Sequence, residues 1–435
     1  MKKILSLLAL FFITTTSVDA LQEFKKISFD EAINHALQTN PQIKMSKIDV
    51  EISKNNIKTA SKFLNPNIGT FQNIGKVATG NPQQIGADFT IEILKRGKRK
   101  QLAKSNSLAA FDNQKFQEYL LIYEVKYAYF NFLHKKANLK LITEQKKLTE
   151  ELYYNAEKDY KKGLISKIDV IQAKIAFNRA NIYHNIAKSE LVKAQNQFNT
   201  ILNSQNVEYD TKEETLTTKY DEFNTAAPNQ LEELNITFEI VKNYALENRL
   251  DLLAAKQEVE SAKKNLAVIK SQLIPDFQVI GGYAYETKGI SDNGRFNSGA
   301  YAGANLVNIP LFYRYQPEIQ NAKLQIEKAQ LHYEDLKVDV TRDITDAWEK
   351  FVIAKNNLIY YNAEVLANSK DLLDESVKSL NKKEIDMATF IISKKLYLEL
   401  ILSYQSALND YYISYAELLK EVNISGLSLL VPEKI

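Results

Sequence analysis

The sequence predicts a mainly α-helical chain with a smaller amount of membrane-type β-structure, arranged as two similar halves. Three observations support this fold class. Long proline-free segments carry heptad-spaced apolar residues, short glycine-rich segments alternate in hydropathy, and both features occur twice in the same order. The composition, 45% hydrophobic and 25% charged with a formal net charge of +3, is that of a folded protein. Lysines and glutamates are interspersed, which argues against a nucleic-acid partner.

The first twenty residues have the pattern of a secretory signal peptide. Lys2 and Lys3 precede a short apolar run, and Val18 to Ala20 offers small residues for cleavage. The apolar run is about half as long as the roughly twenty residues that a membrane-spanning helix needs. We therefore expect residues 1–20 to be removed and the mature chain to be exported. The chain has no cysteine, which excludes disulfides, thiolate metal sites and a lipidated N-terminal cysteine.

An internal repeat organises the rest of the chain. Segment 28–66 aligns without gaps with segment 237–275, and farther along Ala103 aligns with Ala322. Each half reads as a helix, a glycine-rich segment and a very long helical stretch without proline. The expected organisation is a signal peptide (1–20), a first repeat (27–205), a linker (206–235), a second repeat (236–424) and a C-terminal tail (425–435).

The glycine-rich segments read as one β-hairpin per half. In the second half, 277–286 alternates along a strand, and 299–312 forms its partner. Strands of about ten residues cross a bilayer when tilted, but four strands are too few for a barrel, so several chains must contribute to one. The alternative is a soluble β-subdomain that caps a helical rod. Aromatic residues form a candidate interfacial belt, with ordinary strand packing as the alternative: Phe277, Tyr283, Tyr285, Phe296 and Tyr301.

The long helical stretches have the spacing of a coiled coil. In the second half, apolar residues from Ile319 to Ala354 follow one another at steps of three or four, which predicts a left-handed supercoil. In the first half, the stretch 98–162 contains neither glycine nor proline. As one helix it would extend about 95 Å. This length is unsuited to a globular core and suits a hollow tube of helices.

The segment "KKGLISKIDVIQAK" predicts a tight helical hairpin. Gly163 suits the left-handed conformation that ends a helix, and Leu164 can seal the turn. Ser166 with Asp169 three residues later is close to a capping box that starts the next helix. The repeat places the second tip at Lys382 and makes Asn381 the candidate for its left-handed position. Two acidic residues lie near this second tip, Glu384 and Asp386.

This organisation resembles the outer membrane efflux protein family, the TolC-like channels. The resemblance covers nearly the whole mature chain and is carried by an ordered set of motifs: "SFDEAINHALQTNPQI", "TFEIVKNYALENRLDL", "LNPNIG", "LIPDFQ", "VNIPLF" and "GLISKIDVIQAK". It implies a homotrimer in the outer membrane of a Gram-negative bacterium. Twelve strands, four from each chain, would form one barrel in the outer-membrane lipid, and the helices would form a tunnel in the periplasm. It also implies two partners, a periplasmic adaptor and a proton-driven inner-membrane transporter.

The resemblance further implies roles for the two tips. The first tip, with Gly163, Leu164, Ser166 and Asp169, would contact the adaptor. The second tip would close the periplasmic end, with gate candidates Asn381, Lys382, Glu384 and Asp386. Some family members carry aspartate rings in this constriction. The corresponding residues here, Ala388 and Ile391, are not acidic.

No residue pattern predicts an enzyme. The four histidines lack metal-site spacing, and no Gly-x-Ser-x-Gly occurs. The basic run Lys95 to Lys100 lacks the pattern of a phosphate loop and reads as a basic collar near a membrane face. We therefore expect no catalytic, metal or cofactor site. The favoured function is a passive exit duct for small molecules, drugs or metal ions. Two alternatives remain: a secreted coiled-coil structural or adhesive protein, and an exit duct for type I protein secretion.

Overall fold

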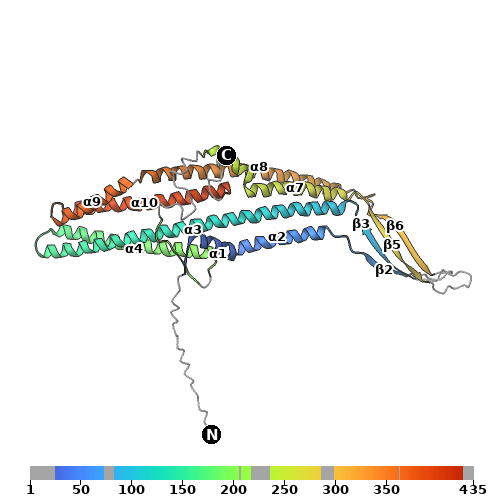
Figure 1. Cartoon of the computed structure of the whole chain (residues 1–435), viewed down its shortest axis with the longest axis horizontal. Coiled ribbons are helices and arrows are strands. Elements are labelled where there is room, and N and C mark those ends of the chain that lie inside the picture. The colour runs from blue at the N-terminus through green and yellow to red at the C-terminus, as the bar shows by residue number, and fades with distance from the viewer. Residues whose placement is uncertain are drawn as a thin grey trace, which may run out of the picture.

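The computed structural model describes residues 25–72, 83–204, 207–216, 236–285, 298–361 and 363–424. It is an elongated body in which long helices run side by side and a small sheet extends from one end (Figure 1). The first half contains β1 (Lys25–Ile27), α1 (Phe29–Thr39), α2 (Pro41–Ala60), β2 (Asn67–Gln72), β3 (Gln83–Ile91), α3 (Lys95–Lys161), α4 (Lys167–Ile201) and β4 (Tyr209–Thr211). The second half contains α6 (Phe238–Asn248), α7 (Leu250–Ser271), β5 (Asp276–Tyr285), β6 (Gly299–Val307), α8 (Gln316–Tyr360), α9 (Ala363–Asn381) and α10 (Met387–Val422).

The four longer strands form one antiparallel sheet in the order β2-β3-β5-β6. Each half contributes one hairpin, and the two hairpins join where β3 pairs with β5, with Gly86 opposite Gly282. The prediction of one hairpin per half is therefore confirmed. The last strand ends at Val307, earlier than the expected 312, because the following segment turns toward α8 through Asn308, whose φ is +58°.

The helices form two successive open layers along the rod. Next to the sheet, α2 packs on α3, α3 on α7 and α7 on α8. Beyond the middle of the rod, α4 packs on α3, α3 on α10 and α10 on α9. The 67-residue helix α3 runs through both layers, which confirms the long uninterrupted helix of the first half. The corresponding stretch of the second half is divided, because α8 ends at Tyr360 and α9 begins at Ala363.

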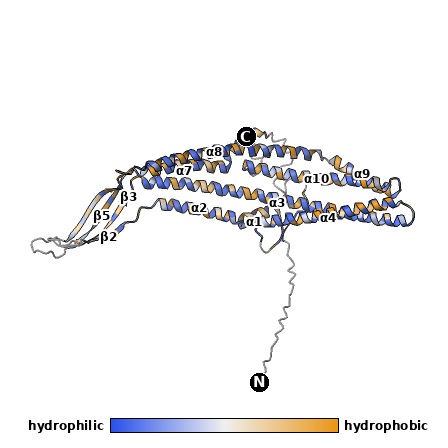
Figure 2. Ribbon diagram, turned by 180° about the vertical axis from the view of Figure 1, so that it is seen from behind, coloured by the Kyte–Doolittle hydropathy of each residue, from blue (hydrophilic) through white to orange (hydrophobic). Residues whose placement is uncertain are grey.

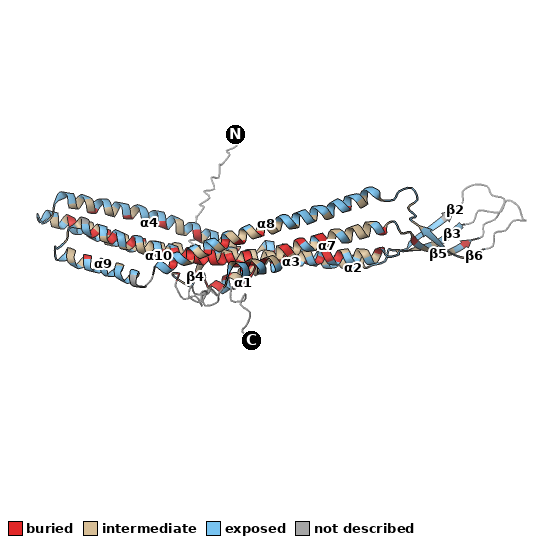
Figure 3. Ribbon diagram, turned by 90° about the horizontal axis from the view of Figure 1, so that it is seen from above, coloured by how far each residue is buried: buried red, intermediate tan, exposed pale blue. Residues whose placement is uncertain are grey.

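The main hydrophobic core lies at the middle of the rod, where the buried residues concentrate (Figure 3). Aromatic rings from both halves meet there. Phe29 of α1 packs on Phe130 of α3 with ring centroids 5.4 Å apart, and Phe130 packs on Tyr412 of α10 at 5.0 Å. Beside this core, β1 and β4 form a short parallel pair, so the segment expected as a linker includes a strand. The core joins the two halves at the level where the layers meet.

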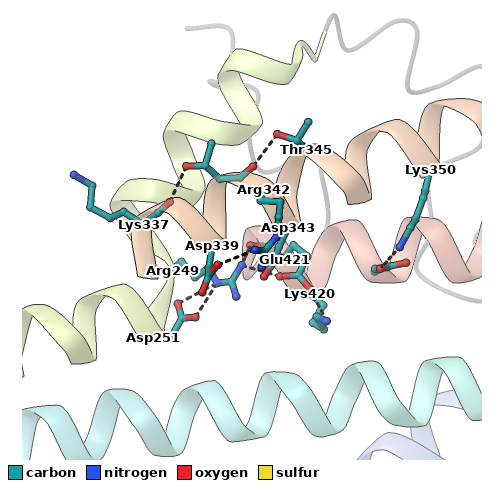
Figure 4. Close-up of polar contacts among 12 residues, drawn as sticks. Arg249, Asp251, Lys337, Asp339, Arg342, Asp343, Thr345, Lys350, Lys420 and Glu421 are labelled. Atoms are coloured by element: carbon teal, nitrogen blue, oxygen red, sulfur yellow. Dashed lines mark hydrogen bonds and ion pairs between the residues drawn. The ribbon is translucent and has the colours of Figure 1, made fainter. Parts of the chain in front are cut away.

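A buried ion-pair network fixes the start of α7 against the end of α10 (Figure 4). Arg249 donates from Nη1 to Glu421 Oε2 at 2.7 Å, and its Nε lies 3.0 Å from both carboxylate oxygens of Asp251. The Arg249 and Glu421 side chains are each 8% exposed. Each charge has a second partner, since Arg249 also pairs with Asp251 and Glu421 also pairs with Lys420, so the network has no uncompensated member.

The coiled-coil seam of the second half is confirmed. Ala322, Val340, Ile344, Ala347 and Phe351 are buried along α8, and the other residues of the seam are buried or half-buried. Apolar and polar residues are interleaved along the long helices (Figure 2). No helix in the described ranges combines the length and the apolar character needed to cross a membrane. The expected signal peptide, the tail 425–435 and Phe296 lie outside the described residues.

Candidate functional site: open edges and helical tips

Both helical layers and the sheet end in the same two open edges. On one side lie β2, α2 and α4, and on the other lie β6, α8 and α9 (Figure 1). Within the part of the chain that the structure describes, the two outer strands have no further strand on their outer side. An unpaired strand edge presents free backbone donors and acceptors, which favour pairing with another strand. The open edges are therefore candidate contact surfaces.

The outer helices of the layer next to the sheet carry exposed apolar stripes. On α2, Met45, Ile48 and Ile52 follow at spacings of three and four. On α8, Leu324, Leu331 and Val338 follow at seven-residue spacing. These are the spacings of a coiled-coil seam. Each helix therefore has a second apolar side beyond the one that packs within the chain.

Helix α4 shows the two sides most clearly. Four alanines at seven-residue spacing are buried on one side: Ala173, Ala180, Ala187 and Ala194. On another side, Ile168, Ile175 and Ile182 also follow at seven-residue spacing and are 66%, 55% and 59% exposed. Small alanines let α4 approach its neighbour closely, whereas the isoleucines have the size and branching typical of a coiled-coil seam. Exposed apolar stripes of this kind mark interaction surfaces.

The sheet has one apolar and one polar face. Phe277, Val279, Tyr283 and Tyr285 share the face that also carries Ile85. On the other face, Asp88 accepts hydrogen bonds from Gln278 at 2.7 Å and from Asn67 at 3.0 Å. Alternation of this kind suits a sheet that has lipid on one side and water on the other.

Tyr301 lies on the polar face, apart from the other aromatic residues of the expected belt. It pairs with Gly282, and its ring covers both Gly282 and Gly86 so closely that a Cβ atom at either glycine would collide with it. The two glycines leave a groove that the tyrosine ring fills, which is a common way to support glycine within a sheet. Phe277, Tyr283 and Tyr285 thus share one face of the sheet, and Tyr301 lies on the other.

The first tip has the predicted geometry. Gly163 adopts φ +72°, its amide donates to the Tyr160 carbonyl at 2.9 Å, and the Leu164 amide donates to the Asp159 carbonyl at 2.9 Å. This pair of hydrogen bonds is a Schellman motif. Ser166 then starts α4 through a reciprocal capping box with Asp169. The side chain of Leu164 remains about half exposed, so the tip presents an apolar side chain on a rigid turn.

The second tip repeats this motif one residue later than expected. The Lys383 amide donates to Leu380 at 3.0 Å, and the Glu384 amide donates to Ser379 at 2.9 Å. Lys383, with φ +64°, therefore takes the left-handed position, while Asn381 is the last residue of α9. The prediction of Asn381 was wrong. It relied on the tolerance of asparagine for the left-handed conformation. The turn instead follows the repeat and lies one residue beyond Lys382, because the second half has one more residue between Ala347 and the tip than the first half has after Ala128.

The acidic residues of the second tip have different environments. Asp386 is the N-cap of α10, and its Oδ1 accepts from the Thr389 amide at 2.8 Å. Hydrogen bonds from the Thr389 side chain and backbone lower the pKa of Asp386. Glu384 is exposed, and its Oε1 lies 4.0 Å from the Lys382 ammonium. Asp386 is therefore structural as well as charged, whereas Glu384 is a surface charge.

The junction between sheet and helices contains a buried ion pair that the sequence pattern did not reveal. Lys95, the first residue of α3, lies 2.7 Å from Asp276, the first residue of β5, and the two side chains are 4% and 5% exposed. The predicted basic collar is wrong for Lys95, because its ammonium is neutralised inside the protein. Arg96 stacks over the ring of Phe63, and Arg99 pairs with Glu92. Within the described residues, no group of three or more acidic, histidine or cysteine side chains could hold a metal ion.

Comparisons with known proteins agree with this geometry. The family model for the outer membrane efflux protein matches residues 32–204 and 241–374, more than half of the chain. The CusC channel, described for its conformational changes on folding and transmembrane channel formation, has a similar structure at TM-score 0.70 and 15% identity, with 92% of both chains covered. The Campylobacter jejuni CmeC outer membrane channel is similar at TM-score 0.68 and 16% identity, and the match covers 91% of this chain and 85% of the CmeC chain. The Vibrio cholerae outer membrane protein VceC is similar at TM-score 0.68 and 15% identity, and the match covers 91% of this chain and 95% of the VceC chain.

A search of curated protein sequences finds no match. The low identities to the solved channels establish a shared fold, and the family model establishes the relationship by sequence. The matched ranges include both strand hairpins, the first long helical hairpin, and α8 with the first part of α9 in the second half. The chain belongs to the outer membrane efflux protein family.

Proposed function

We propose that three copies of this chain form the passive exit duct of a tripartite efflux pump in the outer membrane. The observation that carries the proposal is the set of open edges shared by the sheet and both helical layers. A periplasmic adaptor and an inner-membrane transporter would deliver the cargo, and the duct itself would use no energy.

Internal duplication supports the ring. Within one chain, the end of the first half packs on the start of the second half through β3 on β5 and α3 on α7. The repeat makes the free edges equivalent to this internal joint, because β6 and α8 correspond to β3 and α3, while β2 and α2 correspond to β5 and α7. Contact between β6 and α8 of one copy and β2 and α2 of the next would repeat the internal contact. Head-to-tail contacts generate a closed ring when the rotation from copy to copy closes, and the proposed duct has such a rotation.

The number of copies follows from the width that a duct needs. Two copies would give eight strands, and side chains fill the interior of a barrel of that size. Three copies would give twelve strands and leave an open interior, with the apolar face carrying Phe277 and Tyr283 toward lipid. The family to which the chain belongs is one of efflux channels, and this favours the trimer over a secreted adhesive rod.

The two tips would then have separate tasks. The first tip, with Leu164 on a turn held by Gly163, Ser166 and Asp169, would meet the adaptor. The second tip, with Asn381, Lys382, Glu384 and Asp386, would narrow the periplasmic entrance. Both tips lie at the end of the rod opposite the sheet (Figure 1). A sheet in the outer membrane therefore points both tips into the periplasm.

A cross-linking experiment tests the ring. Val268 of α7 and Leu102 of α3 line one cavity, and the repeat offsets place Thr59 of α2 and Asn321 of α8 at the equivalent positions, where both are exposed in the single chain. The natural chain lacks cysteine, so Thr59→Cys and Asn321→Cys introduce the only thiols. In the outer membrane, a short bismaleimide should convert the double variant into covalent dimers and trimers, whereas each single variant should remain uncoupled.

Two results would contradict the proposal. Cross-linking of a single variant with itself would mean a two-fold contact between identical surfaces, and absence of coupling in the double variant would mean that these edges do not meet. Conductance of the purified protein in a planar bilayer completes the test. A trimer that inserts without any conductance would retain the ring and refute the duct.

A further inference from the structure

A cavity of about 280 Å³ lies between α3, α4 and α10. Its walls are mainly apolar and include Ile142 and Leu152 of α3, Ala176 of α4, and Leu398 and Leu402 of α10. It begins about 15 Å above the first tip, given the rise of 1.5 Å per helical residue. Apolar cavities with a few convergent polar groups are the usual form of a small-molecule site.

One buried cation faces this cavity. Lys394 of α10 lines the cavity and is only 4% exposed. Its ammonium makes one long hydrogen bond, 3.4 Å to the Gln145 carbonyl of α3. None of the carboxylates in the described ranges lies within 4.0 Å of it, whereas buried lysines are usually paired. The burial of an ammonium without a counter-charge is unfavourable, so an anion that entered the cavity would compensate it.

The other charged groups around the cavity are already engaged. Arg179 of α4 is exposed to solvent and donates one hydrogen bond to the Tyr183 hydroxyl at 3.4 Å, and the exposed Lys395 pairs with Glu399 at 3.4 Å, so neither is a buried cation like Lys394. Glu151 of α3 acts on Lys394 from farther away and only partly offsets its burial, which lowers the pKa of Lys394 to about 8. Near neutral pH, the lysine is therefore largely protonated and still lacks a close anion.

We propose that this cavity binds a small amphipathic carboxylate, with its apolar body between α3, α4 and α10 and its carboxylate on the Lys394 ammonium. The volume is at the small end of the range for ligand pockets, and the charge complementarity selects an anion over a neutral molecule. A ligand seated there would hold the α3–α4 hairpin against α10. The site lies within one chain, so its existence is independent of the proposed duct.

Calorimetric titration of the full chain in lipid nanodiscs at pH 7 tests the proposal, with naphthalene-2-carboxylate as the probe and naphthalene-2-carboxamide as its neutral analogue. The carboxylate should bind saturably with one molecule per chain, and the carboxamide should bind at least tenfold more weakly. In Lys394→Met, carboxylate affinity should fall to the carboxamide level. The matched control Lys188→Met, which removes an exposed cation of α4 that does not line the cavity, should change affinity less than twofold.

Two further measurements keep the test decisive if Lys394→Met fails to fold. Ala176→Phe fills the cavity without altering Lys394 and should abolish binding of both probes. In the natural chain, carboxylate affinity should fall as pH rises above about 8, because the free site loses its proton there. Equal binding of the two probes, full binding to Ala176→Phe, or no saturable binding would each overturn the proposal.

Discussion

The buried ion pair between Lys95 and Asp276 offers a quantitative test of how the sheet is joined to the helices. It connects the start of α3 in the first half with the start of β5 in the second half. Asn308, just after β6, also donates to Asp276 Oδ2 at 2.9 Å. Three crossings between sheet and helices therefore meet at one carboxylate.

Lys95→Met removes the cation and leaves the carboxylate of Asp276 buried with only the Asn308 amide. Because both side chains are at most 5% exposed, solvent cannot take over the lost interaction. Loss of one partner of a buried pair costs about 3–5 kcal/mol, and 1.4 kcal/mol corresponds to a factor of ten in an equilibrium constant. We therefore expect the ratio of folded to unfolded protein to fall by about two to three and a half orders of magnitude.

Asp276→Leu should lower the free energy of unfolding by a similar amount, because it leaves the ammonium of Lys95 buried without a counter-charge. The double variant Lys95→Met/Asp276→Leu removes both charges, and replacement of a whole buried pair by apolar side chains is often neutral or stabilising. Its loss should therefore be much smaller than the sum of the two single losses. The double-mutant cycle would give a coupling energy of at least about 3 kcal/mol.

Reversible urea unfolding in detergent, followed by the gel mobility of folded and unfolded forms, measures these free energies. Lys100→Met is the matched control, because this lysine belongs to the same basic run and is exposed. It should change stability by less than about 0.5 kcal/mol. A loss below about 1 kcal/mol in Lys95→Met, or strictly additive losses in the double variant, would refute the reasoning.

Three further predictions concern the tips, the edge and the buried lysine. Gly163→Ala forces a Cβ into the left-handed position at a cost of about 1–2 kcal/mol, so hydrogen exchange of the Leu164 amide should accelerate about 5- to 30-fold. Lys383→Gly should slow exchange of the Glu384 amide. Equal exchange rates in variant and natural protein would count against the motif. Ile175→Lys places a charge in the exposed stripe of α4 and should shift the assembly toward monomers in native mass measurements, whereas Ile175→Leu should not. An intact trimer in both variants would exclude α4 from the interface. Burial lowers the pKa of Lys394 from its usual 10.5 to about 8, so unfolding takes up a proton between pH 8 and pH 10.5. The free energy of unfolding should therefore increase with pH over this range, and Lys394→Met should lack this rise.

Much of the fold follows from local spacing in the sequence. The duplication, the 67-residue helix α3 and the capping box at Ser166 depend on residues that are close in the chain, and all were predictable. The alternation that places Phe277 and Tyr283 on one face is equally local. These features need only the periodicities of helix and strand and the stereochemistry of helix ends.

Features that depend on distant contacts were not predictable in the same way. Lys95 and Asp276 are separated by 181 residues, and each alone reads as an ordinary surface charge. Lys394 occurs in a run of two lysines, where the helical pattern does not indicate which one is buried. The position of Lys383 was missed for a simpler reason, since the repeat offset shifts by one residue after Ala347. One signal was present and unused: the seven-residue spacing of Ile168, Ile175 and Ile182 already indicates a second seam on α4.

The duplication explains why one chain can specify a ring. A repeat whose end fits its own start carries both surfaces of a head-to-tail contact, and the internal joint between β3 and β5 shows that this fit exists. Selection for a well-packed internal joint therefore also shapes the edges that meet between copies. The edges need not be identical to the internal joint. The isoleucines of α4 and the leucines of α8 mark the difference, because these side chains remain exposed in the single chain. In the proposed ring, assembly would cover these stripes and leave the tips, where the two halves differ by Gly163 and Lys383.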